Sequence, residues 1–140
     1  MEYVGIRPFA EKDIPDKVRW INDPENNQYL HYELPLEVDR TQRWFLNNKG
    51  RTDRYDAVIT YDDVSVGIIG LLSIKDVSAE FYITIGERTF LHKGIAKKAS
   101  LLLLDYAFAD LLLDCVYLYV EVDNISAQKL VEKCGLFRKE

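Results

Sequence analysis

Cysteine is scarce in this chain, where Cys115 and Cys134 are the two thiols among 140 residues. Two thiols are too few for the disulfide framework of a small secreted domain, and neither has a histidine or another cysteine at the spacing of metal ligands. We therefore expect two free, buried thiols in a reducing compartment, with no disulfide and no metal site.

Hydrophobic segments of membrane-spanning length are also absent. Leu101–Leu104 is apolar, but Asp105, Asp110 and Asp114 interrupt the residues that follow, whereas a spanning helix needs about 20 predominantly apolar residues. The segment Met1–Arg7 has neither the basic nor the apolar region of a signal peptide. The sequence therefore predicts a cytoplasmic protein with no membrane partner.

The chain has no excess of positive charge. It carries 18 lysines and arginines against 23 aspartates and glutamates, which gives a formal net charge of −5. A chain-wide positive field, the usual electrostatic basis of nucleic-acid binding, is therefore missing. We expect no nucleic-acid partner, and an acidic surface suits a small cationic molecule better.

No linker rich in proline, glycine or serine divides the sequence, and no internal repeat is visible. The length of 140 residues is typical of one domain, and 48% apolar with 29% charged residues is ordinary for a globular protein. We expect a single domain over residues 1–140.

Hydrophobic periodicity and turn residues predict ten elements in the order β-α-α-β-β-β-α-β-α-β. The predicted strands cover residues 3–9, 55–61, 65–74, 79–85, 115–122 and 136–139, and the predicted helices cover 13–21, 36–47, 94–109 and 126–134. Asp62 and Asp63 provide hairpin chemistry between two strands. The crossover through the helix at Gly94 implies parallel pairing in the second half. The fold class is therefore α/β: a mixed, mainly antiparallel central sheet flanked by helices.

The segment around Gly94 carries the clearest sign of a binding site. Gly94 lies where a loop enters a helix, and Ala96 follows two residues later. Small residues let a phosphate approach the backbone, and the first-turn N–H groups lack partners within the helix. Lys93, Lys97 and Lys98 add positive charge in an acidic protein. By itself the segment also fits a plain helix start with solvated lysines, since it is neither a Walker loop nor a Gly-x-Gly-x-x-Gly turn.

Together with the residues after it, this segment resembles the GNAT superfamily of N-acetyltransferases. The pyrophosphate motif of that family, Gln/Arg-x-x-Gly-x-Gly/Ala, is matched at Gly94 and Ala96, while Leu91 stands where Gln or Arg is usual. The second motif of the family is matched at Asn124, Ala127, Lys133, Gly135 and, conservatively, Leu136.

The first half of the chain extends the resemblance. Ile6-Arg-Pro-Phe, Lys12-Asp-Ile and Trp20-Ile-Asn-Asp-Pro-Glu are similar to the opening of the branch that includes ribosomal-protein and amino-sugar acetyltransferases. Trp20 and the run Arg43-Trp44-Phe45 are most similar to nucleotide-linked amino-sugar acetyltransferases. The resemblance covers nearly the whole chain. It implies an acyl-CoA N-acyltransferase-like fold, which is short here at the C-terminal hairpin because the family continues past the position of Phe137.

The resemblance implies acetyl-CoA as co-substrate, bound where the strands 79–85 and 115–122 splay apart. The backbone of Ile83–Ile85 would pair with the pantetheine amides, the amides from Leu91 to Ala96 would hold the pyrophosphate, and Asn124 would contact the pantetheine arm. The cofactor-binding residues expected on this basis are Ile83, Thr84, Ile85, Leu91, His92, Lys93, Gly94, Ile95, Ala96, Asn124 and Lys133.

Amide formation from a thioester requires a neutral amine, although a free alkyl amine has a pKa of about 10.4. A carboxylate can accept the proton, often through a water. Glu80 is the first candidate because its strand lines the acceptor channel in the resembled family. Glu121, with Asp123 beside it, is the second. His31 has a suitable ordinary pKa and lies in the segment that covers the acceptor in the family.

Two departures from the family pattern bear on function. The family usually places a tyrosine seven residues after the motif asparagine to protonate the leaving thiolate, and counting from Asn124 gives Val131. Water or another side chain, such as Cys134, would replace it, or catalysis has been lost. The strand hairpin that closes the sheet in the family is the second departure: another subunit supplies it, it is truncated, or it is dispensable. An uncovered sheet edge favours a homodimer.

Three functions are consistent with the sequence. The first is acetyl-CoA-dependent N-acetylation of a primary amine of a small molecule, with a nucleotide-linked amino sugar preferred and a polyamine next. The second takes a protein N-terminus as the acceptor. The third is a non-catalytic domain that binds or senses acyl-CoA, which Val131 favours. The intact anion loop and Glu80 favour the enzyme.

Overall fold

The computed structural model describes residues 3–28, 30, 32–91, 93–119 and 137–139. Their strands form one sheet in the order β1-β2-β3-β4-β5-β6. The strands are β1 (Val4–Pro8), β2 (Tyr55–Tyr61), β3 (Val64–Lys75), β4 (Ser78–Ile85), β5 (Cys115–Tyr119) and β6 (Phe137–Lys139). Every strand predicted from the sequence is present, with ends that differ by a few residues.

The pairing of the strands is mixed, as predicted. β1 to β4 form an antiparallel meander, whereas β4 pairs in parallel with β5, and β5 in parallel with β6. Asp62 and Asp63 form the turn between β2 and β3 with φ angles of 48° and 67°. Two successive positive φ angles are typical of a tight hairpin turn whose twist matches that of the strands. The predicted hairpin is thereby confirmed.

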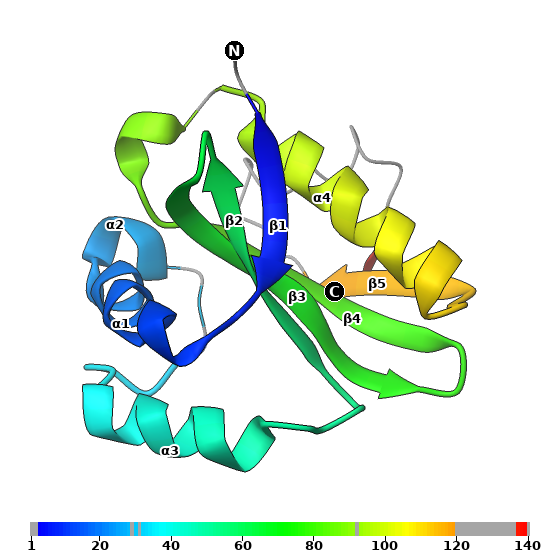
Figure 1. The fold of residues 1–140 in the computed structure, drawn as a ribbon, viewed down its shortest axis with the longest axis horizontal. Coiled ribbons are helices and arrows are strands. Elements are labelled where there is room, and N and C mark those ends of the chain that lie inside the picture. Colours follow the sequence, from blue (N-terminus) through cyan, green and yellow to red (C-terminus); the bar gives the residue numbers. More distant parts are fainter. Residues whose placement is uncertain (1–2, 29, 31, 92, 120–136, 140) are drawn as a thin grey trace.

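Helices cover both sides of the sheet. α1 (Ile14–Asn22), α2 (Pro24–Asn27) and α3 (Val38–Asn48) lie on one side, and α4 (Ile95–Asp105), which continues into a π-helical turn at Tyr106–Asp110, lies on the other (Figure 1). The predicted helices at 13–21, 36–47 and 94–109 are confirmed. The predicted helix at 126–134 lies outside the described residues.

Pro24 predicts the end of the helix before it, and α1 does end at Asn22. The short helix α2 is not predicted by the sequence: Pro24 occupies its first position, where a missing N–H costs nothing. Asp23 caps this turn by accepting a hydrogen bond from the Glu25 amide at 3.0 Å. Among the described residues no helix is long and apolar enough to cross a membrane.

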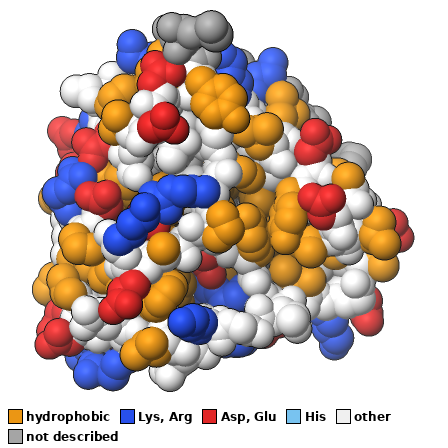
Figure 2. All heavy atoms as spheres, in the orientation of Figure 1, with side chains coloured by type: hydrophobic (Ala, Val, Ile, Leu, Met, Phe, Trp, Pro, Cys, Tyr) orange, Lys and Arg blue, Asp and Glu red, His pale blue; other side chains and the backbone are white. Residues whose placement is uncertain are grey.

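The larger hydrophobic core lies between the sheet and α4. It joins Ile69, Leu71 and Phe81 from the strands to Leu103 from the helix. A smaller cluster of Trp20, Ile21 and Ile68 packs α1 onto the opposite face of the sheet. The surface in Figure 2 carries acidic and basic side chains interspersed with hydrophobic ones, rather than separated by sign.

The pattern of Val38, Trp44 and Phe45 predicts the core side of α3. Val38, in the first turn of the helix, is however 42% exposed. Thr41 is the buried residue of this helix. Its hydroxyl donates to the Glu37 carbonyl at 2.7 Å, so its burial leaves no polar group unsatisfied.

Candidate active site

The strands β4 and β5 pair over a short distance and then separate. Their register runs from Ser78↔Cys115 to Glu80↔Tyr117, yet β4 continues to Ile85. Beyond Glu80, β4 keeps its pairing with β3, where Ile83 to Ile85 lie opposite Ile69 to Gly67. Among the described residues, the other edge of this part of β4 has no neighbouring strand. Its N–H and C=O groups can therefore pair with a bound molecule as with an added strand.

The N-terminus of α4 is shaped by Gly94. This residue caps the helix in the left-handed conformation, with φ 75° and ψ 10°. Such a backbone is strained for any residue with a Cβ. A Cβ built there would have no neighbour within 4 Å, so the space above the glycine is open. The glycine thus provides both the turn into the helix and room for a ligand.

Positive charge surrounds this helix end. Lys93, Lys97 and Lys98 are exposed, and the first N–H groups of the helix carry the positive end of its dipole. The Ile95 side chain is 2% exposed and anchors the helix in the core. The backbone of Ile95, not its side chain, is therefore what a ligand can reach. This arrangement suits a phosphate or pyrophosphate.

Leu91 contributes less than the sequence predicts. Its amide donates to the Arg88 carbonyl at 3.1 Å, closing the short turn Arg88–Phe90. That N–H is already used and is unavailable to an anion. The Lys98 amide donates to the Gly94 carbonyl at 3.2 Å. The amides of the first helical turn that remain available to a bound anion are therefore those of Ile95, Ala96 and Lys97.

Glu80 lies at the point where β4 and β5 separate. It is the last residue of β4 to pair with β5, opposite Tyr117, and it is partly buried. Ala79 and Phe81 on either side of it belong to the core beneath α4. Because strand residues alternate between faces, Glu80 lies on the face covered by α1 to α3. The carboxylate and the N-terminus of α4 are therefore on opposite sides of the sheet.

Glu87 shows how another carboxylate near the end of the same strand is used differently. It accepts a hydrogen bond from the Trp20 indole at 2.5 Å and pairs with Arg19 at 2.6 Å. The Trp20 hydrogen bond and then Arg19 lower the pKa of this carboxyl. Glu87 is thus committed to holding α1 against the end of β4 and is not a suitable base.

The remaining predicted site residues cannot be placed. His31, His92, Glu121, Asp123, Asn124, Val131, Lys133 and Cys134 lie outside the described residues. The structure therefore brings Glu80, Ile83, Thr84 and Ile85 onto one strand and positions Gly94 to Ala96 and the lysines at the helix end.

A charged network on the face of Glu80 was missed by the sequence reasoning. Tyr82, two residues beyond Glu80, donates its hydroxyl to Asp56, and Arg54 donates to both oxygens of Asp56 at 2.7 and 2.8 Å. Burial, followed by the nearby Asp56 charge, raises the pKa of Tyr82 well above its ordinary value. Asp56 and Tyr82 lie on β2 and β4, two strands that are not adjacent, so no local pattern predicts their contact.

Lys17 lies close to this network. Its side chain is buried, and burial lowers the pKa of its ammonium to about 8, with the Asp56 charge acting in the opposite direction. The sequence did contain a signal: Lys17 stands three residues after Ile14 and four before Ile21, on the apolar face of the helix. A lysine at such a position has to find partners within the protein.

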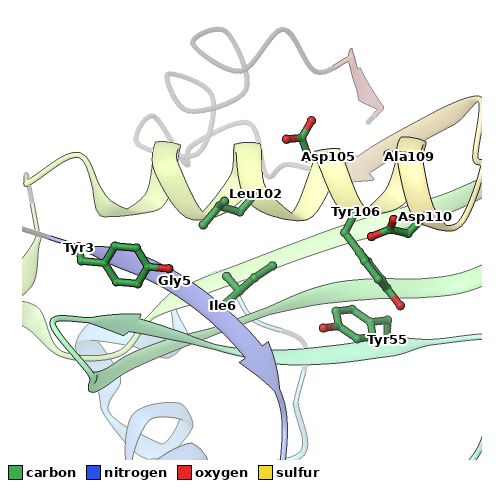
Figure 3. A pocket seen from close by; sticks show the side chains of 9 residues that line it. All are labelled: Tyr3, Gly5, Ile6, Tyr55, Leu102, Asp105, Tyr106, Ala109 and Asp110. Carbon is green, nitrogen blue, oxygen red and sulfur yellow. The ribbon is translucent and has the colours of Figure 1, made fainter.

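A separate cavity of about 540 Å³ lies between β1 and α4. Figure 3 shows Tyr3, which precedes β1, around the cavity with Ile6 from β1 and Tyr55 from β2. Leu102 and Tyr106 come from the helical segment. None of its lining residues belongs to the separated part of β4 or to the N-terminus of α4. It is therefore distinct from the candidate active site.

The sequence of residues 4–136 matches the family model described as the acetyltransferase (GNAT) domain. The chain belongs to the GNAT acetyltransferase family. A spermidine N(1)-acetyltransferase from Vibrio cholerae is 32% identical over 127 residues, covering 84% of this chain and 72% of that protein. One from Escherichia coli K12 is 29% identical over 139 residues, covering 94% and 72%.

Solved structures of the family have the same fold. The crystal structure of a spermidine N-acetyltransferase from Vibrio cholerae in complex with CoA and spermine matches with a TM-score of 0.87 and 27% identity. The match covers 94% of this chain and 79% of that one. The predicted acyl-CoA N-acyltransferase-like fold is thereby confirmed.

This GNAT protein is an N-acetyltransferase, with acetyl-CoA as its co-substrate and a small amine as its acceptor. The open edge of β4 and the basic N-terminus of α4 fit the amides and the phosphates of CoA respectively. The narrower expectation of the ribosomal-protein and amino-sugar branch finds no support, because the relatives above are spermidine acetyltransferases.

Proposed function

We propose that the protein transfers the acetyl group of acetyl-CoA to a primary amine of an aliphatic polyamine. The observation that carries this proposal is the similarity, over 94% of the chain, to an enzyme solved with both CoA and spermine. The net charge of −5 supports it, because a polyamine is a polycation at neutral pH. A nucleotide-linked amino sugar, the first expectation from the sequence, is an anion and gains nothing from that charge.

In this proposal acetyl-CoA lies across the sheet between β4 and β5. The pyrophosphate binds the amides of Ile95 to Lys97 and the exposed lysines beside them. The pantetheine arm runs along the open edge of Ile83 to Ile85, pairing with the backbone. The thioester then reaches the place where the two strands separate, which is also the place of Glu80.

Glu80 acts as the general base in this scheme. An alkylammonium must lose a proton before its nitrogen can attack, and a carboxylate on the acceptor face can take that proton directly or through a water. The nitrogen then forms a bond to the thioester carbonyl carbon and loses a second proton to water, the carbon–sulfur bond breaks, and the CoA thiolate leaves. Because Val131 stands at the position of the usual tyrosine, we propose that water protonates the thiolate.

The direct test is an acceptor panel with the purified protein. Acetyl-CoA is mixed with spermidine, spermine, a nucleotide-linked amino sugar or a peptide with a free N-terminus, and thiol release is followed while calorimetry measures CoA binding. We expect release with the two polyamines. Release with the amino sugar or the peptide alone would contradict the polyamine proposal. CoA binding without release from any of them would contradict it as well and favour a sensing role.

A further inference from the structure

The buried ammonium of Lys17 is surrounded by aromatic rings. Its Nζ lies 3.4 Å from the ring centroid of Trp44 and 5.8 Å from those of Phe9 and Tyr32. All three distances are within the range of cation–π attraction, and the contact with Trp44 is short. We call Phe9, Tyr32 and Trp44 the aromatic cage.

The cage is assembled from parts of the chain that are distant in sequence. Phe9 follows β1, Tyr32 lies in the segment before α3, and Trp44 lies on α3. Phe9 and Trp44 pack edge to face at 5.6 Å, which fixes the angle between two of the rings. The rings therefore surround the ammonium from separate elements. Such an arrangement recognises an alkylammonium by its charge and its apolar stem together.

Asp56 and Arg54 contribute opposite charges to the surroundings of the cage, and the Arg54 guanidinium lies 5.1 Å from the centroid of a cage ring. Asp56 attracts the Lys17 ammonium, and it is held in place by Arg54 and by the Tyr82 hydroxyl. Gly70 makes this possible: a Cβ at Gly70 would lie 2.5 Å from the Tyr82 ring, so the ring crosses β3 because no side chain is there. Asp56 thus connects the cage to Tyr82.

Tyr82 places the cage beside the proposed reaction centre. It follows Glu80 by two residues on the same strand, so both side chains lie on the face covered by α1 to α3. It also lies where the pairing between β4 and β5 has ended. A molecule held with one amine at Glu80 can therefore extend along this face toward Tyr82 and Asp56.

We propose that the aromatic cage is an alkylammonium subsite which Lys17 occupies from within, and that a distal ammonium of the polyamine acceptor competes with Lys17 for it. The proposal rests on the proposed function. The two occupants have the same chemistry, a primary ammonium on a flexible alkyl stem. Burial lowers the pKa of Lys17 to about 8, because the charged form loses hydration inside the protein. Moving the Lys17 ammonium out into water would remove this desolvation penalty. Lys17 thereby limits how tightly a long polyamine binds.

The first test compares acceptors in the variant Lys17→Ala. Emptying the cage is expected to lower the KM for spermidine by about tenfold, because that factor corresponds to the free energy of a desolvated cation–π contact. The kcat should stay within about twofold of the wild-type value. The KM for n-butylamine, which has no second ammonium, should not change. Lys49→Ala is the control, because it removes an exposed positive charge at the end of α3. Equal effects on both amines, or an effect of the control, would overturn the proposal.

The second test examines the cage without turnover. n-Butylammonium chloride is expected to raise the Tm of Lys17→Ala, relative to sodium chloride at equal ionic strength, by more than it raises the Tm of the wild type or of Lys17→Ala/Trp44→Leu. No selective rise would overturn the proposal. If Lys17→Ala does not fold, Lys17→Met keeps the apolar stem, and its KM ratio for spermidine against n-butylamine must fall instead. A wild type that does not acetylate spermidine disproves the proposed function, whereas the Tm test reports on the cage alone.

Discussion

Glu80 and Glu87 have the same side chain near two ends of one strand, but their neighbours give them different roles. Glu87 is held by Trp20 and Arg19. Glu80 lies partly buried where β4 and β5 separate, with no ion pair to another of the described residues. A base must be able to take up a proton and release it, which a carboxylate bound by two donors does poorly. The difference favours Glu80 as the proton acceptor.

Glu80→Gln tests this role. Loss of a general base is expected to lower kcat/KM for spermidine by roughly a hundredfold at neutral pH. The loss should shrink as the pH rises towards the pKa of the amine, because more of the acceptor is then neutral in solution. Asp76→Asn, in the turn before β4, is the matched control and should be neutral. A loss that is the same at every pH would remove Glu80 from this role.

Lys17 makes a prediction about stability. The pKa of its ammonium is about 8 in the folded protein against 10.5 in an unfolded chain, so above pH 8 the unfolded state binds more protons. The cost of charging Lys17 is present in full below pH 8 and is relieved as the pH rises. The free energy of unfolding of Lys17→Met should therefore exceed that of the wild type at pH 7. This difference between the two proteins should be about 1–2 kcal/mol smaller at pH 9.5. Denaturant titrations at the two pH values measure this, and parallel pH curves would contradict it.

At the scale of the element, the start of α4 combines a backbone requirement with a charge. Gly94 provides the left-handed turn, and the helix that follows presents free amides and lysines beside open space. Neither a glycine nor a helix end is specific alone. Their position next to the open edge of β4 makes the combination suitable for a long molecule with phosphates at one end.

Gly94→Glu is expected to weaken CoA binding by at least about tenfold, because it places a carboxylate where the pyrophosphate is proposed to bind. Gly50→Glu is a closely matched control: Gly50 also has a positive φ, 83°, and open space around a built Cβ. Both variants carry the same backbone strain and the same added charge. Calorimetry with CoA should therefore separate them, and an equal loss in both would show that the effect is not local.

At the scale of the whole molecule, the net charge of −5 acts at long range on a polycationic acceptor. Raising the ionic strength from about 10 to 200 mM shortens the Debye length from roughly 30 Å to below 10 Å. We expect kcat/KM for spermidine to fall several-fold over this range, and more steeply than kcat/KM for n-butylamine. Initial rates at low substrate concentration provide the comparison. Equal salt dependence for both amines would show that the overall charge does not steer the acceptor.

The sequence alone determined the features that depend on neighbours along the chain. Alternation of apolar residues fixed the strands, Asp62 and Asp63 fixed the hairpin turn, and Gly94 fixed the start of α4. Each follows from local sterics and from which face of an element is apolar. Each family motif lies within a short stretch of the chain and could be matched for the same reason.

Only the tertiary structure decided which side chains meet. Tyr82 donates to Asp56 across Gly70, although Tyr82 and Asp56 are 26 residues apart in sequence. Trp20 donates to Glu87, which is 67 residues away. The cage around Lys17 also needs three separate elements to converge. A periodic pattern predicts which side chains are buried, but it does not predict which other side chains they contact. The partner of a buried charge is set by strand order and helix packing, and these arise only when the whole chain is folded.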